Sequence, residues 1–284
     1  MNEQIYITKA TGERELFDES KLISSLERSG ADSNIAKKVL AHIKAELEDG
    51  MSTRDIYRHA FEVLNREEKP VAMKYSLRRA IMDMGPTGFP FEKLIAEIFR
   101  TKGFEATTEF VAEGDCVEHE IDVAAWNKEK LIMIEAKFHN ELGMKSDLKT
   151  VLYVNSRWAD LANKEFPGFG DKARKLDEGW LITNTKFSEQ AIKYALCRNM
   201  KLVGWNYPRE GSLQDMIEES GLHPITVLDS ISQKEKSILM EAGVITCKQA
   251  IENQDIVLQS GVHKEKIEKM IAEIKLIQNK KLNG

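Results

Sequence analysis

The residues of this sequence with the clearest chemical potential are Asp122, Glu135 and Lys137, within the segment 117–139. Side chains alternate along a strand, so Asp122 lies on one face of a first strand, and Glu135 and Lys137 share one face of a second. The polar residues 127–130 suit a short hairpin loop between the two strands. If Trp126 and Leu131 close that loop, the antiparallel register places Asp122 directly opposite Glu135.

Two carboxylates held face to face need a positive partner. Directly opposed side chains have Cβ atoms roughly 4.5–5.5 Å apart, and like charges at that distance are destabilising. A proton, a cation or a metal ion between Asp122 and Glu135 relieves the repulsion. Mg²⁺ fits because it prefers oxygen ligands, keeps several waters and often uses only one or two carboxylates. The alternative is a surface ion cluster on a hairpin edge, and a slip of one residue would separate the two carboxylates.

The flanking sequence predicts the elements that position this hairpin. Upstream, a helix begins near Pro90, carries apolar residues at helical core spacing and ends at Gly103. A strand over 106–111 follows, and after the hairpin comes a helix over 146–163. A strand over 179–184, a helix capped by Ser188 and a strand over 201–206 complete the order. The predicted fold class is α/β, with an αβββαβ core and a further helix and strand.

An aspartate followed one hairpin later by Glu-x-Lys resembles the active site of the PD-(D/E)xK nuclease superfamily, and the surrounding sequence is most similar to its Mrr-like restriction-endonuclease branch. The resemblance implies Mg²⁺-assisted hydrolysis of a nucleic-acid phosphodiester. It implies that Asp122 and Glu135 hold the metal with the carbonyl of Ala136, while Lys137 orients or activates water and stabilises the charged phosphorane. Mrr-like relatives often carry a glutamate on the first helix, which makes Glu92 a further catalytic candidate. A glutamate in a first turn also simply favours the helix dipole.

The sequence departs from the Mrr-like pattern just before Asp122. The family often has a Gly-Asp-Gly-Gly-like run there, whereas residues 114–117 of this chain are Gly-Asp-Cys-Val. Asp115 is therefore an alternative for the aspartate role, although it falls in a predicted loop. His119 faces away from Asp122 by strand parity, and His139 lies beyond the Glu-x-Lys face, so a structural role is the simpler interpretation of both.

The first 85 residues carry a second pattern. A two-strand hairpin turns at Gly12, Asp18 caps the helix that follows, and Ser52 begins a capping box before another helix. A closing helix covers residues 71–85. Together these features resemble an ATP-cone, the small nucleotide-binding regulator of ribonucleotide reductases.

The resemblance to ATP-cones implies that ATP or dATP binds this segment as an effector. The residues it assigns to nucleotide binding are Lys9 and Lys21 on the phosphates, Thr53 near the nucleotide, and Tyr75 and Arg78 on the closing helix. The family usually follows its first lysine with a basic residue, but this chain has Ala10. For each lysine alone, a solvated surface is the alternative. This segment contains no Walker-type glycine-rich loop and no obvious hydrolytic base. These absences favour a nucleotide that acts as an effector over one that is hydrolysed.

Stretches rich in glycine and proline, at 85–90 and near 221–224, divide the sequence. The predicted domains are an ATP-cone regulatory domain (1–86), a nuclease-like domain (87–222) and a small helical domain (223–284). In the last of these, Gly243 and Gly261 each end one helix. This segment has a weak resemblance to helix-hairpin-helix or SAM-like modules, and contact with the DNA backbone and protein interaction are both open roles.

Composition limits the function classes further. A net charge of −5 and a pI near 5.8 argue against an indiscriminate, strongly basic nucleic-acid binder. The candidates for a locally basic DNA-binding face are Lys145, Lys149, Arg157, Lys172, Arg174 and Lys175. Three dispersed cysteines argue against a zinc ribbon and a disulfide framework. Without an apolar run near 18 residues or a signal-peptide core, we expect a cytoplasmic protein with no membrane partner.

These patterns together predict a nucleotide-regulated, Mg²⁺-dependent endodeoxyribonuclease. Its expected partners are DNA, the nucleotide effector and, as a possibility, a second copy of the chain. The alternative is a non-catalytic ATP- or dATP-sensing protein that binds DNA or a partner through a nuclease fold. Processing of branched DNA or RNA is a third option that the sequence leaves open.

Overall fold

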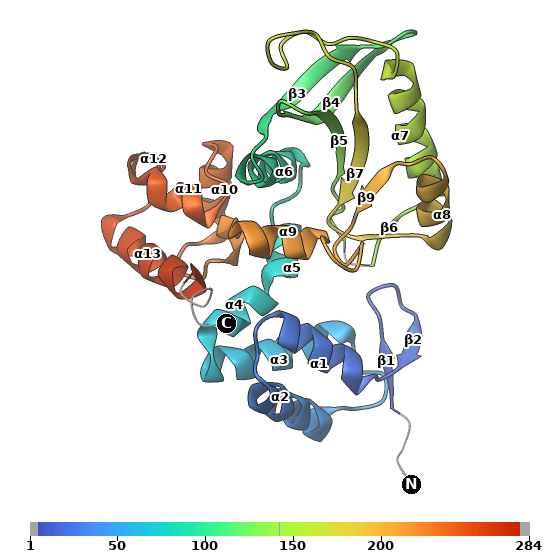
Figure 1. Cartoon of the computed structure of the whole chain (residues 1–284). Coiled ribbons are helices and arrows are strands. Elements are labelled where there is room, and N and C mark those ends of the chain that lie inside the picture. The colour runs from blue at the N-terminus through green and yellow to red at the C-terminus, as the bar shows by residue number, and fades with distance from the viewer. Residues whose placement is uncertain (1–4, 142, 279–284) are drawn as a thin grey trace. The chain divides into compact units, whose positions relative to one another are not determined.

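The structure is a computed structural model that describes residues 5–141 and 143–278 of the 284-residue chain. It divides into two compact units (Figure 1). The first comprises Met1–Ala80, Val227–Ser232 and Val262–Gly284, and the second comprises Ile81–Thr226 and Gln233–Gly261. The predicted boundaries of three domains stay predictions.

The first unit combines a small hairpin with helices. Its elements are β1 (Tyr6–Thr8), β2 (Arg14–Leu16), α1 (Glu19–Arg28), α2 (Ser33–Glu46), α3 (Thr53–Glu67), α4 (Lys69–Tyr75) and α13 (Lys264–Gln278). The predicted turn is confirmed at Gly12, which has a φ of 82°, a value that glycine adopts without a steric penalty. The predicted cap is also confirmed, because the Asp18 side chain accepts the Ser20 N–H.

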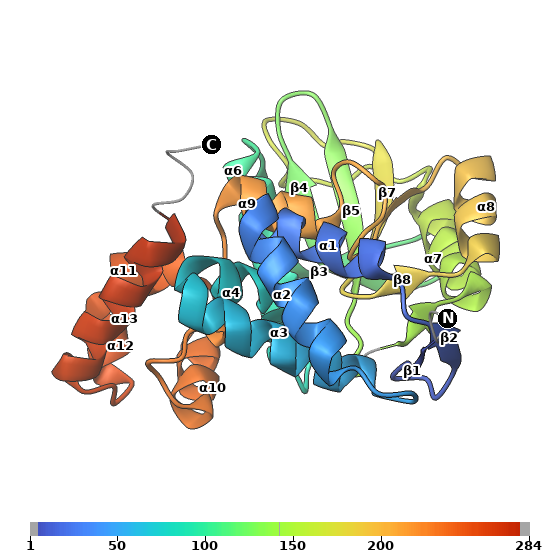
Figure 2. The same cartoon turned by 90° about the horizontal axis from the view of Figure 1, so that it is seen from below.

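Amphipathic helices build the core of this unit (Figure 2). Leu26 of α1, Val39 of α2 and Ala60 and Leu64 of α3 are completely buried, each on the apolar face of its helix. The buried carboxylate of Glu273 on α13 accepts the backbone N–H groups of residues 229 and 230. These hydrogen bonds connect α13 to the loop over 227–232, which belongs to the same unit.

The predicted closing helix over 71–85 is interrupted, which is a correction to the sequence analysis. Helix α4 ends at Tyr75, and α5 (Leu77–Met82) begins two residues later. The Ser76 hydroxyl donates to the carbonyl of Met73 at 2.7 Å. Serine hydroxyls compete in this way for backbone carbonyls and bend helices, and propensity at Ser76 alone did not reveal the break.

The second unit contains the predicted αβββαβ order, followed by the expected extra helix and strand. Its elements are α6 (Phe89–Thr101), β3 (Glu105–Glu113), β4 (Glu118–Trp126), β5 (Leu131–Lys137), β6 (Lys145–Ser146), α7 (Leu148–Leu161), β7 (Glu178–Thr183), β8 (Lys186–Phe187), α8 (Glu189–Cys197), β9 (Lys201–Val203), α9 (Leu213–Ser220), α10 (Gln233–Glu241), α11 (Cys247–Glu252) and α12 (Gln254–Gln259). The predicted helix ends at Gly243 and Gly261 are confirmed, since each glycine has a positive φ just beyond a helix.

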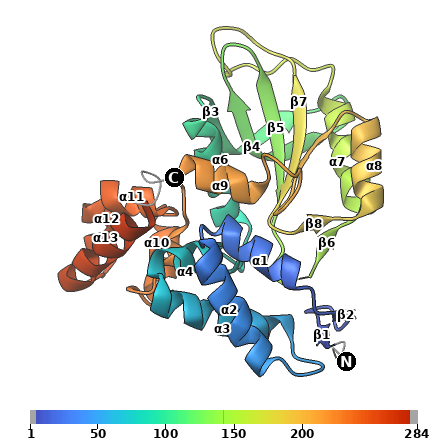
Figure 3. The same ribbon diagram turned by 60° about the horizontal axis from the view of Figure 1, so that its bottom comes forward.

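A five-stranded sheet with the order β3-β4-β5-β7-β9 forms the centre of this unit. Strands β3, β4 and β5 are antiparallel, whereas β5, β7 and β9 are parallel. Helix α6 covers one face, and α7 and α8 cover the other (Figures 1 and 3). The short parallel pair β6–β8 lies at the starts of α7 and α8. This layered arrangement holds the ends of β4 and β5 in fixed positions.

The apolar residues that predict α6 also hold it against the sheet. Pro90 occupies the first turn, where its missing N–H costs nothing. Phe91, Leu94, Ile95 and Ile98 are fully buried against the sheet. Because burial of this apolar face fixes the rotation of α6 about its axis, Glu92 has a defined direction on the neighbouring face of the first turn.

Candidate active site

The β4–β5 hairpin has the predicted register. Trp126 pairs with Leu131 and Ala124 pairs with Met133, and the Asn127 N–H closes the loop on the Lys130 carbonyl at 3.1 Å. The paired ladder ends at Val123 and Ile134, one position before the two acidic residues. Continuing the same register places Asp122 opposite Glu135.

Asp122 lies against β5 through a specific hydrogen bond. Its Oδ2 accepts the backbone N–H of Ala136 at 2.7 Å. On its other side, the β3–β4 ladder pairs Thr108 and Phe110 with β4 but skips Glu109, which has a φ of 58°. Positive φ is uncommon outside glycine and marks a local distortion. The backbone pairing of Asp122 is therefore interrupted on both sides, toward β3 and toward β5.

Glu135 is held by Arg157 of α7. The Arg157 guanidinium contacts Oε2 of Glu135 through Nη1 and the carbonyl oxygen of Glu120 through Nη2. Both side chains of the ion pair are largely buried, at 10% and 16% exposure. Arg157 was expected on a basic DNA-binding face, and this expectation is wrong for the described conformation, because its charged head is directed into the site. No sequence pattern indicates this partner of Glu135, because Arg157 lies 22 positions away on another element.

Glu92 joins the same group of acidic residues. Its Oε1 lies near the start of α6, 3.1 Å from where a Cβ on Gly88 would be. The pKa of Glu92 is raised to about 7, with burial as the largest cause and the negative charges of Asp122, Glu109, Glu120 and Glu135 as further causes. Helix α6 packs against β4 and β5, so Glu92 is on an element that contacts the hairpin and is within electrostatic range of Asp122 and Glu135.

Lys137 is exposed at the end of β5, on the same strand face as Glu135. It pairs with Thr183 of β7 in the parallel register. Its positive charge lowers the pKa values of Asp122 and Glu135, which places its ammonium group within electrostatic reach of both. The predicted triad therefore occupies one region of the hairpin.

The electrostatics of the site disfavour its fully ionised form. The pKa of Glu135 is raised to about 7, chiefly by burial and then by the Asp122 charge, while Arg157 and Lys137 oppose the rise. Burial also raises the pKa of Asp122, while the Ala136 N–H lowers it. Carboxylates in this state gain from an additional cation. Such pairs of perturbed acids are frequent at functional sites.

The loop before β4 has a structural role. Asp160 of α7 accepts the N–H groups of Cys116 and Val117 and contacts Nε2 of His119 at 2.8 Å. Hydrogen bonding to His119 is the largest cause that lowers the pKa of Asp160 to about 2. A Cβ at Gly114 would be 2.1 Å from Asp160 Oδ2, so only glycine fits. The loop is therefore built around Asp160 rather than around a second catalytic acid.

The alternatives weighed beside the triad take other partners. Asp115 pairs with Lys164 at 3.4 Å, so its carboxylate contacts the segment that follows α7. Nε2 of His139 lies 3.1 Å from the Ser146 hydroxyl, and its backbone N–H donates to Asn184. These contacts agree with structural roles for His119 and His139.

The proposed basic face is only partly exposed. Arg174 is half-buried and contacts the Asn127 carbonyl and Asp177, so it closes a loop rather than facing solvent. Lys145, Lys149, Lys172 and Lys175 are exposed. Sequence order alone does not distinguish an arginine that supports a loop from one that faces a ligand.

In the first unit, two predicted phosphate-binding lysines converge. The ammonium groups of Lys9 and Lys21 lie 2.9 and 3.3 Å from the same oxygen of Glu15. Strand β1 bridges Thr8 to Ser52, which brings the start of α3, and hence Thr53, next to the hairpin. Three of the five predicted nucleotide-binding residues therefore belong to one neighbourhood.

Tyr75 and Arg78 lie on the two short closing helices rather than on one. Tyr75 stacks on Tyr57 with ring centroids 5.1 Å apart, and burial raises the pKa of its hydroxyl. Burial lowers the pKa of Arg78, whose Nε is buried without a hydrogen-bond partner among the described residues. A buried, unsatisfied guanidinium nitrogen is costly unless something pairs with it.

Three family models match successive parts of the chain. The ATP cone domain matches residues 5–84, the restriction endonuclease model matches 84–206, and the AF1548-like C-terminal model matches 223–278. The chain is thus an ATP-cone domain fused to a restriction-endonuclease-like domain. This confirms the resemblances inferred from the sequence.

An uncharacterized protein of Archaeoglobus fulgidus is 35% identical over 184 residues, covering 64% of this chain and 99% of the relative. A crystal structure described as a protein of unknown function, AF1548, has 34% identity and a TM-score of 0.55, covering 66% of this chain and 97% of that one. By this similarity, the chain belongs to the AF1548-like family. The MspJI restriction endonuclease in complex with a 27-mer oligonucleotide covers 52% of this chain and 35% of that one, at 13% identity and a TM-score of 0.31, which is too low to support an argument.

None of the helices within residues 5–141 and 143–278 combines the length and hydrophobicity that a membrane crossing needs.

Proposed function

We propose that this chain is a Mg²⁺-dependent endodeoxyribonuclease whose activity responds to ATP or dATP bound by the ATP-cone. The observation that carries the proposal is the register of the β4–β5 hairpin, which brings Asp122 opposite Glu135 at the point where both ladders open. The restriction-endonuclease model that matches residues 84–206 supports the same chemistry.

The donor set fits Mg²⁺. Asp122 and Glu135 would hold the ion, with the carbonyl of Ala136 as a further ligand, because hard cations prefer carboxylate and carbonyl oxygens. The pKa values of Glu135 and Glu92 are raised mainly by burial and also by neighbouring carboxylates, and a bound cation would favour their ionised forms. Bound Mg²⁺ would supply Lewis-acid polarisation of the phosphate and a more acidic water.

The chain's own residues would divide the remaining tasks. Lys137 would orient the attacking water and donate to the negatively charged phosphate oxygens. Glu92, whose pKa of about 7 lets it exchange protons near neutrality, would accept a proton from that water. Arg157 would position Glu135 by holding Oε2, so that the carboxylate keeps one orientation. Arg157 acts here through Glu135 and is a positioning residue.

The nucleotide effector would bind at the hairpin of the ATP-cone. Lys9 and Lys21 already share Glu15, so a triphosphate would compete with that carboxylate for both ammonium groups. Thr53 would lie near the nucleotide, and Tyr75 and Arg78 would contribute from the closing helices. The buried, unpartnered Nε of Arg78 supports a ligand-dependent role for that side chain.

The test of the nuclease site compares three proteins on supercoiled plasmid, linear DNA, branched DNA and RNA. Wild type and Glu129→Ala, a change in the exposed loop of the same hairpin, are expected to cleave DNA with Mg²⁺ or Mn²⁺. Glu135→Ala is expected to lose cleavage by roughly a hundredfold or more, because it removes a metal ligand. Equal cleavage by wild type and Glu135→Ala would reject the site.

The test of regulation measures the same cleavage with and without ATP, dATP and ADP. A change in rate that disappears in a Lys9→Ala, Lys21→Ala double variant supports the effector role. Nucleotide binding by calorimetry without any metal binding would instead favour the alternative of a non-catalytic sensor that binds DNA or a partner.

A further inference from the structure

A second group of metal-ligating side chains lies in the first unit, on the facing surfaces of α2 and α3. His42 and Glu46 are one turn apart on α2, and His59 comes from α3. Their donor atoms all lie within 4.8 Å of one another. We propose that His42, Glu46 and His59 form a binding site for a divalent transition-metal ion of the zinc class.

The arrangement of the donors matches such an ion. Nε2 of His42 is 3.5 Å from Oε1 of Glu46, and Nδ1 of His59 contacts Oε2 of the same carboxylate. Ligands at about 2.0–2.1 Å from a tetrahedral zinc ion lie roughly 3.3 Å from each other. The rings of His42 and His59 are 6.1 Å apart and tilted by 35°, so both can direct a nitrogen to one point. Small rotations of these side chains would bring all three donor atoms to coordination distance from one ion.

The scaffold that carries the donors is rigid. Each histidine directly precedes a buried core residue, Ile43 on α2 and Ala60 on α3. Sites built on packed helices hold their ligands more precisely than sites built on loops. The i, i+4 spacing of His42 and Glu46 places both on one face of α2.

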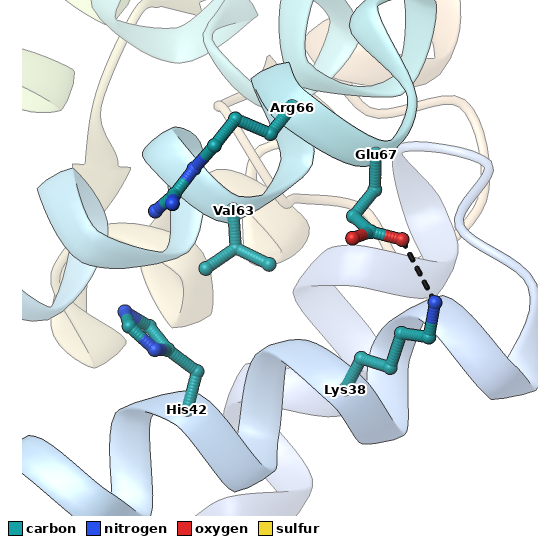
Figure 4. Close-up of a pocket in the computed structure, with 5 residues that line it drawn as sticks. All are labelled: Lys38, His42, Val63, Arg66 and Glu67. Carbon is teal, nitrogen blue, oxygen red and sulfur yellow. Dashed lines mark hydrogen bonds and ion pairs between the residues drawn. The ribbon is translucent and has the colours of Figure 1, made fainter.

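The site is accessible from solvent. The side chains of His42, His59 and Glu46 are 31%, 23% and 42% exposed. A hollow of about 280 Å³ adjoins His42 and is also lined by Lys38, Val63, Arg66 and Glu67. In Figure 4, His42 and Val63 line this hollow, and the Lys38–Glu67 ion pair closes its far end. The hollow gives solvent access to the side chain of His42, one of the three proposed ligands.

The ligand chemistry selects the class of ion. Imidazole nitrogens suit zinc, copper, cobalt and nickel, whereas Mg²⁺ and Ca²⁺ prefer oxygen ligands. With two histidines and one carboxylate, the site differs in kind from the carboxylate site at Asp122 and Glu135. The inference therefore does not depend on the proposed nuclease function.

A bound ion would link α2 to α3. Because the ion binds the folded ATP-cone and not its separated helices, it would stabilise this unit in proportion to its concentration over its dissociation constant. The expected effect is a higher melting temperature with Zn²⁺ in wild type, but not in variants that lack one histidine.

The experiment titrates tag-free, chelator-treated full-length protein with Zn²⁺ in the presence of millimolar Mg²⁺, followed by calorimetry. We expect one equivalent to bind in wild type, in Glu135→Ala and in His263→Gln, an exposed histidine outside the cluster. His42→Gln and His59→Gln are each expected to weaken binding by roughly tenfold or more. Co²⁺ added to wild type should give the intense visible absorption of a four-coordinate site.

Three outcomes of the Zn²⁺ titration would overturn the inference. These are no Zn²⁺ binding by wild type under these conditions, unchanged affinity in both histidine variants, and loss of the bound equivalent in Glu135→Ala. Far-ultraviolet circular dichroism of each variant identifies unfolded protein, and the Co²⁺ spectrum of wild type tests the site without any substitution. A Co²⁺ spectrum typical of six oxygen ligands would also contradict it.

Discussion

Replacing Glu92 with glutamine should stabilise the protein, although Glu92 is a candidate catalytic residue. The folded state raises the pKa of Glu92 from 4.5 to about 7, with burial as the largest cause. Keeping this carboxylate ionised in the folded state therefore costs about 3 kcal/mol. Partial access to solvent reduces that figure to about 2 kcal/mol. Glutamine has nearly the same shape and carries no charge, so Glu92→Gln removes the cost.

The sign of the pH dependence follows from linkage. A carboxyl group with a raised folded pKa binds protons more tightly in the folded state, so its favourable contribution is complete below about pH 4.5 and is lost as the pH rises through about 7. The gain from Glu92→Gln should therefore be about 2 kcal/mol near pH 8 and small near pH 5. For a unit of this size, the gain corresponds to a rise of roughly 4–8 °C in melting temperature.

The assay is thermal unfolding of wild type, Glu92→Gln and Glu97→Gln in EDTA, across this pH range. Glu97 lies on the same helix and pairs with Arg100 at the surface, so its substitution should cost little and show no comparable pH dependence. Millimolar Mg²⁺ should shrink the advantage of Glu92→Gln, because the ion compensates the charge in wild type. An advantage that is absent near pH 8, or as large near pH 5, would refute the electrostatic account of the site.

Three further predictions concern other parts of the molecule. Arg157→Met should lower the free energy of unfolding by about 3 kcal/mol in EDTA, because it leaves Glu135 buried and unpaired, and urea unfolding should show partial recovery with Mg²⁺. Asp160→Asn should lower the melting temperature at neutral pH relative to Asp171→Asn, an exposed control. Because the folded pKa of Asp160 is near 2, its contribution to stability is present above about pH 4 and is lost as the pH falls through about 2. Lys21→Ala should weaken ATP binding roughly tenfold in calorimetry, whereas the exposed Lys37→Ala should not; equal affinities in the two variants would argue against the predicted phosphate contact.

Much of the second unit could be predicted because its loop lengths, strand alternation and helical spacing all indicate the same elements. A four-residue polar loop between Trp126 and Leu131 determines the hairpin register, and strand parity then determines which side chains share a face. Buried apolar residues at helical spacing define the core face of α6 and so the direction of Glu92. These rules depend on neighbours in sequence, which a sequence displays directly.

Other features depend on packing between distant segments. Arg157 lies 22 positions after Glu135, and only the packing of α7 on the sheet brings them together. The loop around Asp160 likewise requires α7 to meet residues more than 40 positions earlier. The interruption lies at Ser76, whose hydroxyl donates to the Met73 carbonyl. No periodic pattern marks any of these interactions.

The central claim is that Asp122 and Glu135 hold a divalent ion beside Lys137. Anomalous diffraction from crystals of the full-length protein grown with Mn²⁺ tests it directly. The account predicts a manganese peak about 2.1 Å from carboxylate oxygens of both residues, with the Lys137 ammonium group on the same side of the hairpin. A well-ordered hairpin with no peak between Asp122 and Glu135 at saturating Mn²⁺ would contradict it.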